Sequence, residues 1–396
     1  MNFFLLSLIK AAVVAFVLLT TLAYLQWVER KVIAHIQVRL GPSRVGPHGL
    51  LQPLADVIKL ITKEDLIPPH VNKILYLAAP FLAVTMALIS ISVIPFGTEI
   101  SLFGVRTWMQ LTDLNIGVLF ILAVSSMGVY GVALAGWASN NKYALLGGLR
   151  SSAQMISYEL PLSLAVASPL LLANTLSLRE LVEKQAGFQF GFLPNWNIFQ
   201  GPWPQIISFV VFLIAGFAET NRVPFDLPEA ENELVAGFHT EYSSMKFASF
   251  FMAEYANMVT VTAMTTILFL GGWQPLFPER FGSHYVPTLA FAIAGAVSLY
   301  HGLNPARKRD RLTLPAAAIV FFAIAFAFAL PAVQSALVPL FWFAAKTGFL
   351  LFVFIWVRGT LPRFRYDQLM GFAWKFLFPV ALLNLLVTGI MVALFS

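Results

Sequence analysis

Long apolar runs recur along the whole sequence, and they constrain the fold more than any other feature. A bilayer core of about 30 Å is crossed by about 20 apolar residues in a helix. Lipid cannot satisfy backbone polar groups, so apolar runs of this length form helices there. We expect ten spans, at residues 3–25, 74–95, 114–138, 153–174, 203–220, 247–271, 285–303, 313–333, 338–357 and 377–395. The sequence therefore predicts an all-α fold, a polytopic transmembrane helical bundle.

The composition supports lipid as the main solvent and excludes several kinds of site. Only 11% of the residues are charged, against about 25% in an ordinary soluble domain. The chain has no cysteine, which excludes iron–sulfur clusters and thiolate zinc sites of its own. The histidines show no ligand spacing with acids, and no GxGxxG or GxxxxGK[ST] pattern occurs, so we predict no metal, dinucleotide or P-loop site. Any redox centre must belong to a substrate or a partner.

The basic residues predict the orientation of the chain in the membrane. The net charge is +6, but lysine and arginine gather in the segments 30–73, 307–311 and 358–375, which follow the first, seventh and ninth expected spans. This clustering is typical of membrane orientation and argues against nucleic-acid binding. By the positive-inside rule these segments are cytoplasmic. Both termini are then expected to be periplasmic.

One cytoplasmic segment, residues 49–66, predicts an amphipathic helix after the first span. Its apolar residues recur at helical spacing; they are Leu50, Leu51, Leu54, Val57, Ile58 and Ile61. The opposite face is too polar to cross the membrane, so we expect the helix to lie along the membrane surface. An ordinary amphipathic linker helix is the alternative.

The loop 219–246 is acidic, although acidic residues contribute little to orientation. It contains Glu219, Asp226, Glu229, Glu231, Glu233 and Glu241, against only Arg222 and Lys246. One interpretation is a solvated face or a docking surface for a basic partner. The other is a set of coupled carboxylates whose pKa values depend on one another and on a nearby ligand.

Three expected helices place a glutamate close to this loop. At 1.5 Å rise per residue, Glu159, Glu219 and Glu254 are expected within about 11 Å of the cytoplasmic boundary. A charged group at such depth costs several kcal/mol unless it is hydrated or paired, and it commonly marks a proton or ion path. Three acids at one depth therefore predict a proton route rather than three separate structural hydrogen bonds.

Four segments of the sequence resemble those of one family, the H subunits of respiratory complex I. They are ERKVIAHIQVRLGPSRVGPHGLLQPLADVIKLITKED, GWASNNKYALLGGLRSSAQMISYELP, AETNRVPFDLPEAENELVAGFHTEYSSMKFASFFMAEY and FIWVRGTLPRFRYDQLMGFAWK. The resemblance covers residues 1–275 and 338–396, which form a family core of eight spans. Ser43 stands where the family has asparagine, a small change in a turn. Residues 276–337 have no counterpart in the resemblance, and we expect an inserted transmembrane hairpin there.

The resemblance implies that the chain forms the membrane end of a quinone tunnel. The residues that match the family's tunnel segments are Glu29, Arg30, Arg39, Arg44, Arg150, Phe225, Arg358, Arg363, Arg365 and Asp367. The residues that match its proton-coupling segments are Glu159, Glu219, Asp226, Glu229, Glu231, Glu233, Glu241 and Glu254. Most of the Arg–Tyr–Asp grouping in the last cytoplasmic loop is also compatible with a structural hydrogen-bond cluster.

The same resemblance implies a proton-translocating NADH:quinone oxidoreductase of which this chain is one part. Quinone is then the substrate, while NADH, FMN and Fe–S clusters belong to partner subunits. The expected partners are the peripheral-arm subunits of the quinone site, small membrane subunits leading to antiporter-like subunits, and lipid. The expected location is the bacterial inner membrane. Two alternatives stay open: a related component of an energy-converting hydrogenase, and a stand-alone proton-coupled transporter, although no repeat or broken midplane helix supports the latter.

Overall fold

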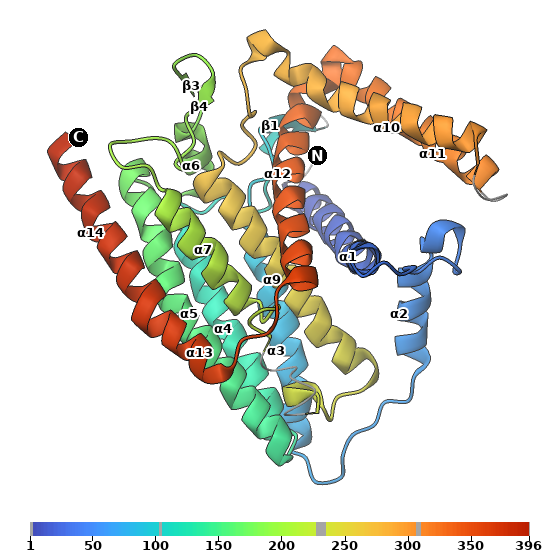
Figure 1. The fold of residues 1–396 in the computed structure, drawn as a ribbon, viewed down its shortest axis with the longest axis vertical. Coiled ribbons are helices and arrows are strands. Elements are labelled where there is room, and N and C mark those ends of the chain that lie inside the picture. The colour runs from blue at the N-terminus through green and yellow to red at the C-terminus, as the bar shows by residue number, and fades with distance from the viewer. Residues whose placement is uncertain (1–2, 103–104, 227–234, 306–309, 396) are drawn as a thin grey trace.

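The computed structural model describes residues 3–102, 105–226, 235–305 and 310–395, and most of them are helical (Figure 1). A helix occupies each of the ten expected positions. These helices are α1 (Phe3–Ile36), α3 (Lys73–Ile91), α4 (Gly117–Ala138), α5 (Lys142–Ala173), α7 (Ile206–Glu219), α9 (Ser244–Phe269), α10 (Val286–Leu303), α11 (Asp310–Ala329), α12 (Pro331–Thr360) and α13–α14 (Tyr366–Phe372 and Phe378–Phe395, joined by a π-helical turn at Ala373–Leu377). The prediction of an all-α polytopic bundle is confirmed.

Eight of the described helices are long and apolar enough to cross a membrane by length and composition. The two other expected spans are α7 and α9. α7 is apolar but has only 14 residues. α9 has 26 residues, but it carries Glu254, Asn257 and several threonines on faces that are mostly buried inside the bundle. Its polarity therefore belongs to the interior of the protein.

The smaller elements lie at the ends of the bundle. The amphipathic helix is α2 (Gln52–Thr62), and α6 (Leu178–Lys184) follows α5. Two short antiparallel hairpins pair β1 (Glu99–Leu102) with β2 (Val105–Trp108), and β3 (Phe188–Gln189) with β4 (Leu193–Pro194). α2 lies at the edge of the bundle (Figure 1), where it contacts α1 and α9, and the apolar residues that predicted it are exposed.

Several helices extend beyond the apolar runs that predicted them. α1 continues to Ile36, so Glu29 and Arg30 lie on a helix and not in a loop. α5 begins at Lys142, where the side chain of Asn141 accepts a hydrogen bond from the backbone N–H of Tyr143. Glu159 therefore lies near the middle of α5, not close to its start. A helix ends where its backbone is capped or broken, whereas hydropathy reports only where lipid ends.

The centre of the bundle consists of α3, α4, α5, α7 and α9, and small residues allow these helices to approach closely. A Cβ on Gly131 of α4 would lie 2.9 Å from the backbone N of Ala83 on α3. Gly136 of α4 and Gly148 of α5 meet in the same way, since a Cβ on either would lie 3.0 Å from the other's Cα. Close backbone approach through small residues is how helices associate in lipid.

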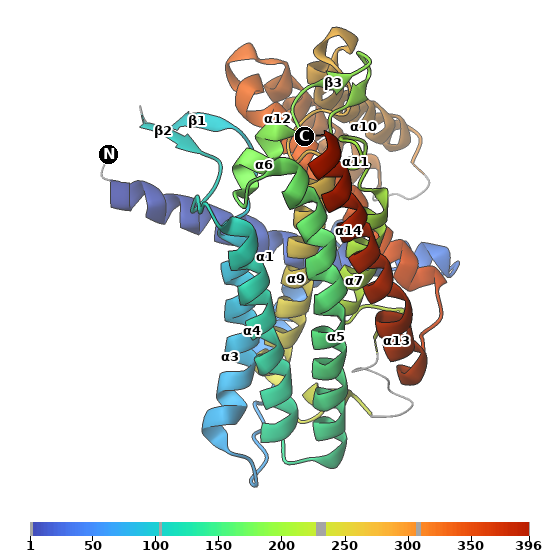
Figure 2. The ribbon, with the colours of Figure 1, turned by 90° about the vertical axis from the view of Figure 1, so that its left-hand side faces the viewer.

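The outer helices run in different directions from this centre. Figure 2 shows α1 running at a steep angle to α3 and α4, and α1 contacts α9 and α12. α10 and α11 pack on each other as a hairpin that extends sideways from one end of the bundle (Figure 1). The expected insertion ended at residue 337, a position that lies inside α12.

Candidate functional site

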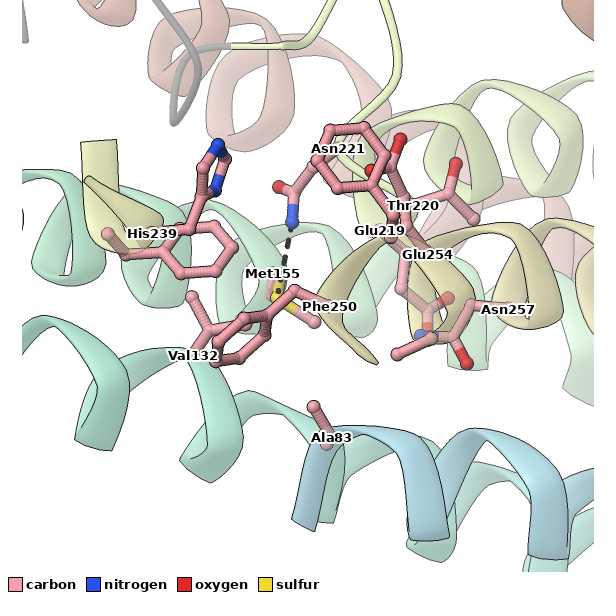
Figure 3. Close-up of a pocket in the computed structure, with 14 residues that line it drawn as sticks. Ala83, Val132, Met155, Glu219, Thr220, Asn221, His239, Phe250, Glu254 and Asn257 are labelled. Carbon is pink, nitrogen blue, oxygen red and sulfur yellow. Dashed lines mark hydrogen bonds between the residues drawn. The ribbon is translucent and has the colours of Figure 1, made fainter. Parts of the chain in front are cut away.

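A cavity lies inside the bundle and is bordered by α3, α4, α5, α9 and the segment that follows α7 (Figure 3). Its polar lining consists of Glu219, Thr220, Asn221, His239, Glu254 and Asn257. Figure 3 shows Glu219, Thr220 and Glu254 together on one side, with His239 and Val132 on the other. Two of the three predicted glutamates therefore face one cavity.

The third predicted glutamate is Glu159, and it and Glu219 are held by adjacent serines of α4. Ser125 donates a hydrogen bond to Glu219 of α7, and Ser126 donates one to Glu159 of α5. Neighbouring helical residues point about 100° apart, so two successive serines reach two different helices. A carboxylate within a membrane protein needs such donors because lipid supplies none.

Glu254 also belongs to a cluster of four charged side chains, two of them buried and two partly exposed, which we call the ion cluster: Glu29, Arg222, Glu254 and Arg358. Arg222 Nη1 lies 3.0 Å from Glu29 Oε1, and Arg222 Nε lies 2.7 Å from Glu254 Oε1. Arg358 also donates to Glu29. The side chains of Glu29 and Arg222 are only 4% and 5% exposed. With all four groups ionised, the cluster contains two positive and two negative charges.

Tyr255 completes the surroundings of the ion cluster. Its hydroxyl donates a 2.7 Å hydrogen bond to Glu29 Oε2, and the guanidinium of Arg222 lies 4.2 Å from the centre of its ring. Burial alone would lower the pKa of Arg222, but the carboxylates of Glu254 and Glu29 outweigh this effect and raise the pKa above its usual value. Arg222 is therefore a permanent charge in the cluster.

The predicted residues around Asp226 form a second, smaller contact between two loops. Arg363 Nη2 lies 2.8 Å from Asp226 Oδ2, whose side chain is only 3% exposed. Phe225 is buried between the rings of Tyr158 and Phe364, at centre distances of 5.5 and 5.6 Å. The loop after α7 is thereby packed against the last loop of the chain.

The other predicted tunnel residues lie nearer the surface. Arg30 Nη1 contacts Asp56 Oδ2 of α2 at 2.7 Å, and Arg39 Nε donates a 2.7 Å hydrogen bond to Gln37 Oε1. Together with Arg44 and Gln52, Arg30 and Arg39 line an open hollow in the first loop.

The predicted residues Arg150 of α5, and Arg365 and Asp367 near the start of α13, make local contacts. Arg150 lies 5.7 Å from the ring centre of Tyr366, and Arg365 Nε lies 3.2 Å from Asp367 Oδ1 in an exposed pair. These residues border the region without joining the ion cluster.

Of the acidic loop, only part can be placed. Glu241 Oε1 accepts a 2.6 Å hydrogen bond from the side chain of Asn141. The predicted coupling residues Glu229, Glu231 and Glu233 lie outside the described residues. Among the described residues, no three His, Asp or Glu side chains are grouped so that they could hold a metal ion.

Sequence reasoning missed several residues of this region. In the sequence Arg222 is only one of two basic residues in an acidic loop, yet in the structure it pairs with Glu29 and Glu254. His239 has no metal-ligand spacing in the sequence, yet it lines the cavity. The serine pair at 125 and 126 was a usable signal, since two adjacent hydroxyls interrupt an apolar run.

The fold and the site together define a polytopic helical membrane protein that buries paired and hydrogen-bonded carboxylates in its bundle. A family model described as NADH dehydrogenase matches residues 9–389. The chain is 76% identical over 392 residues to the first NADH-quinone oxidoreductase H subunit of Solibacter usitatus, covering 99% of this chain and 98% of that protein. It is 52% identical to the second such H subunit of Koribacter versatilis, covering 99% and 98%, and 45% identical to the second of Geobacter metallireducens, covering 100% and 97%.

The chain belongs to the family of complex I H subunits. It is a multi-pass membrane component of an NADH-quinone oxidoreductase, and its partners are other subunits of that complex. The family expected from the four sequence segments is thereby confirmed.

Proposed function

We propose that this chain forms the membrane part of the quinone tunnel and couples quinone reduction to proton translocation. The observation that carries the proposal is the double membership of Glu254, which belongs to the ion cluster and also lines the cavity that holds Glu219. The ion cluster contains Glu29 and Arg358, which were expected on the tunnel side, while Glu219 and Glu159 were expected on the proton side. Glu254 is the common member of the two groups.

In this proposal, quinone enters from the lipid beside α1 and α2 and moves past the first loop. Its head group is reduced at a site completed by a peripheral-arm subunit, with electrons from NADH delivered through the FMN and Fe–S clusters of partner subunits. The chain itself supplies charge and shape: arginines at the first loop, and the ion cluster deeper along the path. The names of the relatives favour quinone over the hydrogenase and transporter alternatives.

The coupling step follows from the charge balance of the ion cluster. A change in the charge of quinone near Glu29 and Arg358 alters the field on Arg222, and therefore the strength with which Arg222 holds Glu254. In a medium of low dielectric constant such couplings are several kcal/mol at contact distance. A proton can then pass between Glu254 and Glu219 across the polar cavity, and onward toward Glu159, which α4 holds through the serine next to the one that contacts Glu219.

The wider setting follows the same proposal. The membrane is the bacterial inner membrane, with both termini periplasmic, and the route beyond Glu159 continues into small membrane subunits that lead to antiporter-like subunits. The proposal keeps Glu229, Glu231 and Glu233 as coupling residues, as their match to the family's acidic segment implies.

The test is Glu219→Gln in the assembled complex. We expect quinone-linked turnover and proton pumping to fall, while oxidation of NADH by an artificial acceptor is unchanged because that reaction uses only partner subunits. Glu183→Gln is the matched control, since Glu183 is an exposed glutamate that pairs with Arg179 away from the cavity. Normal proton pumping in Glu219→Gln would refute the coupling role.

A further inference from the structure

The α10–α11 hairpin is a unit in which two helices are in very close contact. A Cβ on Gly302 of α10 would lie 2.5 Å from Cδ of Pro315 on α11. A Cβ on Gly295 would lie 3.0 Å from the ring of Phe322. Glycines at these two positions let the helices pack along their length. The hairpin can therefore move as one rigid unit, so that fixing one of its ends also fixes the other.

One end of the hairpin is anchored to α12 through aromatic side chains. The ring of Phe291 stacks on Phe328 at 5.5 Å, and Phe341 of α12 contacts both, at 6.1 and 5.9 Å. Trp342 extends the group through Phe341. Aromatic pairs of this kind contribute about 0.5–1.5 kcal/mol each beyond their buried area. This end is therefore fixed to the bundle.

The other end of the hairpin contacts the first loop. His48 Nε2 lies 3.4 Å from Asp310 Oδ1 and 3.3 Å from Thr313 Oγ1, at the start of α11. His48 has a left-handed backbone conformation, with φ of 52°. This conformation is uncommon for a residue other than glycine and is retained only where the surroundings require it.

The first loop is itself tightly folded around His48. Gly46 and Gly49 have φ values of 71° and 78°. A Cβ on Gly49 would lie 2.3 Å from the carbonyl oxygen of Pro42, so this backbone folds back on the stretch between Arg39 and Arg44. A contact at His48 therefore fixes the segment that lines the arginine hollow.

Between its two anchored ends the hairpin is largely exposed. Leu289, Ile293, Val297 and Ile319 are 51–71% exposed, and at 1.5 Å per residue the distance along α10 is about 27 Å. An apolar middle with two fixed ends is the form of a strut that faces lipid, not of a further span packed into the centre.

We propose that the α10–α11 hairpin is a strut that positions the first loop, and that His48, Asp310 and Thr313 form its latch. The latch sets the geometry of the hollow lined by Arg30, Arg39 and Arg44. Its effect on the reaction rests on the proposed function, in which quinone passes this loop. Asp310 and Thr313 are thus positioning residues for quinone admission.

The first experiment tests the latch without measuring activity. The chain has no cysteine, so His48→Cys with Thr313→Cys introduces its only two thiols. In the assembled complex, a short bis-maleimide should link them, and mass spectrometry of this chain should find the joined peptides. The control pair is His284→Cys with Thr313→Cys. His284 lies just before α10, at the end of the hairpin that contacts α12, whereas Thr313 lies at the opposite end. Equal linkage in both pairs, or none in the first, overturns the latch.

The second experiment tests the effect on quinone. Asp310→Ala with Thr313→Val should raise the KM for quinone about fivefold, the factor for one lost hydrogen bond of about 1 kcal/mol. The kcat should stay within twofold. Asp310→Asn, which keeps an acceptor, should restore most of the KM.

If the cross-link forms but KM does not change, the strut does not position the loop and the inference fails. The coupling proposal is unaffected by that result, because it is judged on proton pumping in Glu219→Gln.

Discussion

Arg222 is the residue whose removal tests the site most directly. It pairs with Glu29 and Glu254 in the ion cluster, and its guanidinium also lies on the ring of Tyr255. Arg222→Gln keeps a polar side chain but removes the charge. Both carboxylates then lose an ion pair, and Glu29 keeps its contact with Arg358.

The expected loss of turnover in Arg222→Gln follows from the burial of Arg222 and Glu29. Removing one partner of a buried ion pair costs about 3–5 kcal/mol. If about 1.4 kcal/mol of this cost falls on the slowest step, turnover falls tenfold. We therefore expect quinone-linked turnover in Arg222→Gln to be at most about a tenth of the normal rate. Arg222→Lys keeps the charge but not the two-sided contact of a guanidinium, and we expect an intermediate rate.

The assay compares quinone-linked turnover with NADH oxidation by an artificial acceptor, which reports how much complex has assembled. Arg179→Gln is the matched control. Arg179 also pairs with a carboxylate, Asp113 at 2.9 Å, and also lies on an aromatic ring, Trp108, but the pair is partly exposed. Such pairs contribute about 0–1 kcal/mol, so its turnover should change less than twofold. An assembled Arg222→Gln complex with a rate inside that same range would refute the role of the ion cluster.

Two further substitutions test other parts of the structure. Ser126→Ala removes the hydroxyl that donates to Glu159. A hydrogen bond to a charged group contributes about 1.5–3 kcal/mol, so the number of protons pumped per quinone reduced should fall. An unchanged number in proteoliposomes would argue against a proton route through Glu159. Gly302→Val places a side chain against Pro315; we expect the hairpin helices to separate and become more sensitive to proteolysis than in Gly389→Val, where a Cβ meets nothing within 4 Å.

The positions of the helices could be predicted from the sequence, but their ends could not. Apolar length follows bilayer thickness, so each expected span has a helix at its position. α1 and α5 continue beyond their apolar runs because the residues there still favour a helix and no cap or breaker ends it. This is why Glu29 and Arg150 were expected in loops and lie on helices.

The gathering of the glutamates could be predicted, but their partners could not. Their similar expected depth placed Glu159, Glu219 and Glu254 together, and the structure brings them to one cavity and one serine pair. Which charge neutralises which depends on contacts between residues far apart in sequence. Arg222 and Glu29 are separated by 193 positions, a pairing that hydropathy and local spacing do not contain.

The course of α1 has a consequence for how the protein is made. This first helix carries Glu29, whose two arginine partners follow 193 and 329 positions later. At about 5–20 residues per second, ribosomes need roughly 15–65 s to reach the second partner. Until then the carboxylate has no place in a finished interior and must stay near water. A chain that stops before residue 222 therefore lacks both arginines that pair with the acid of its first helix.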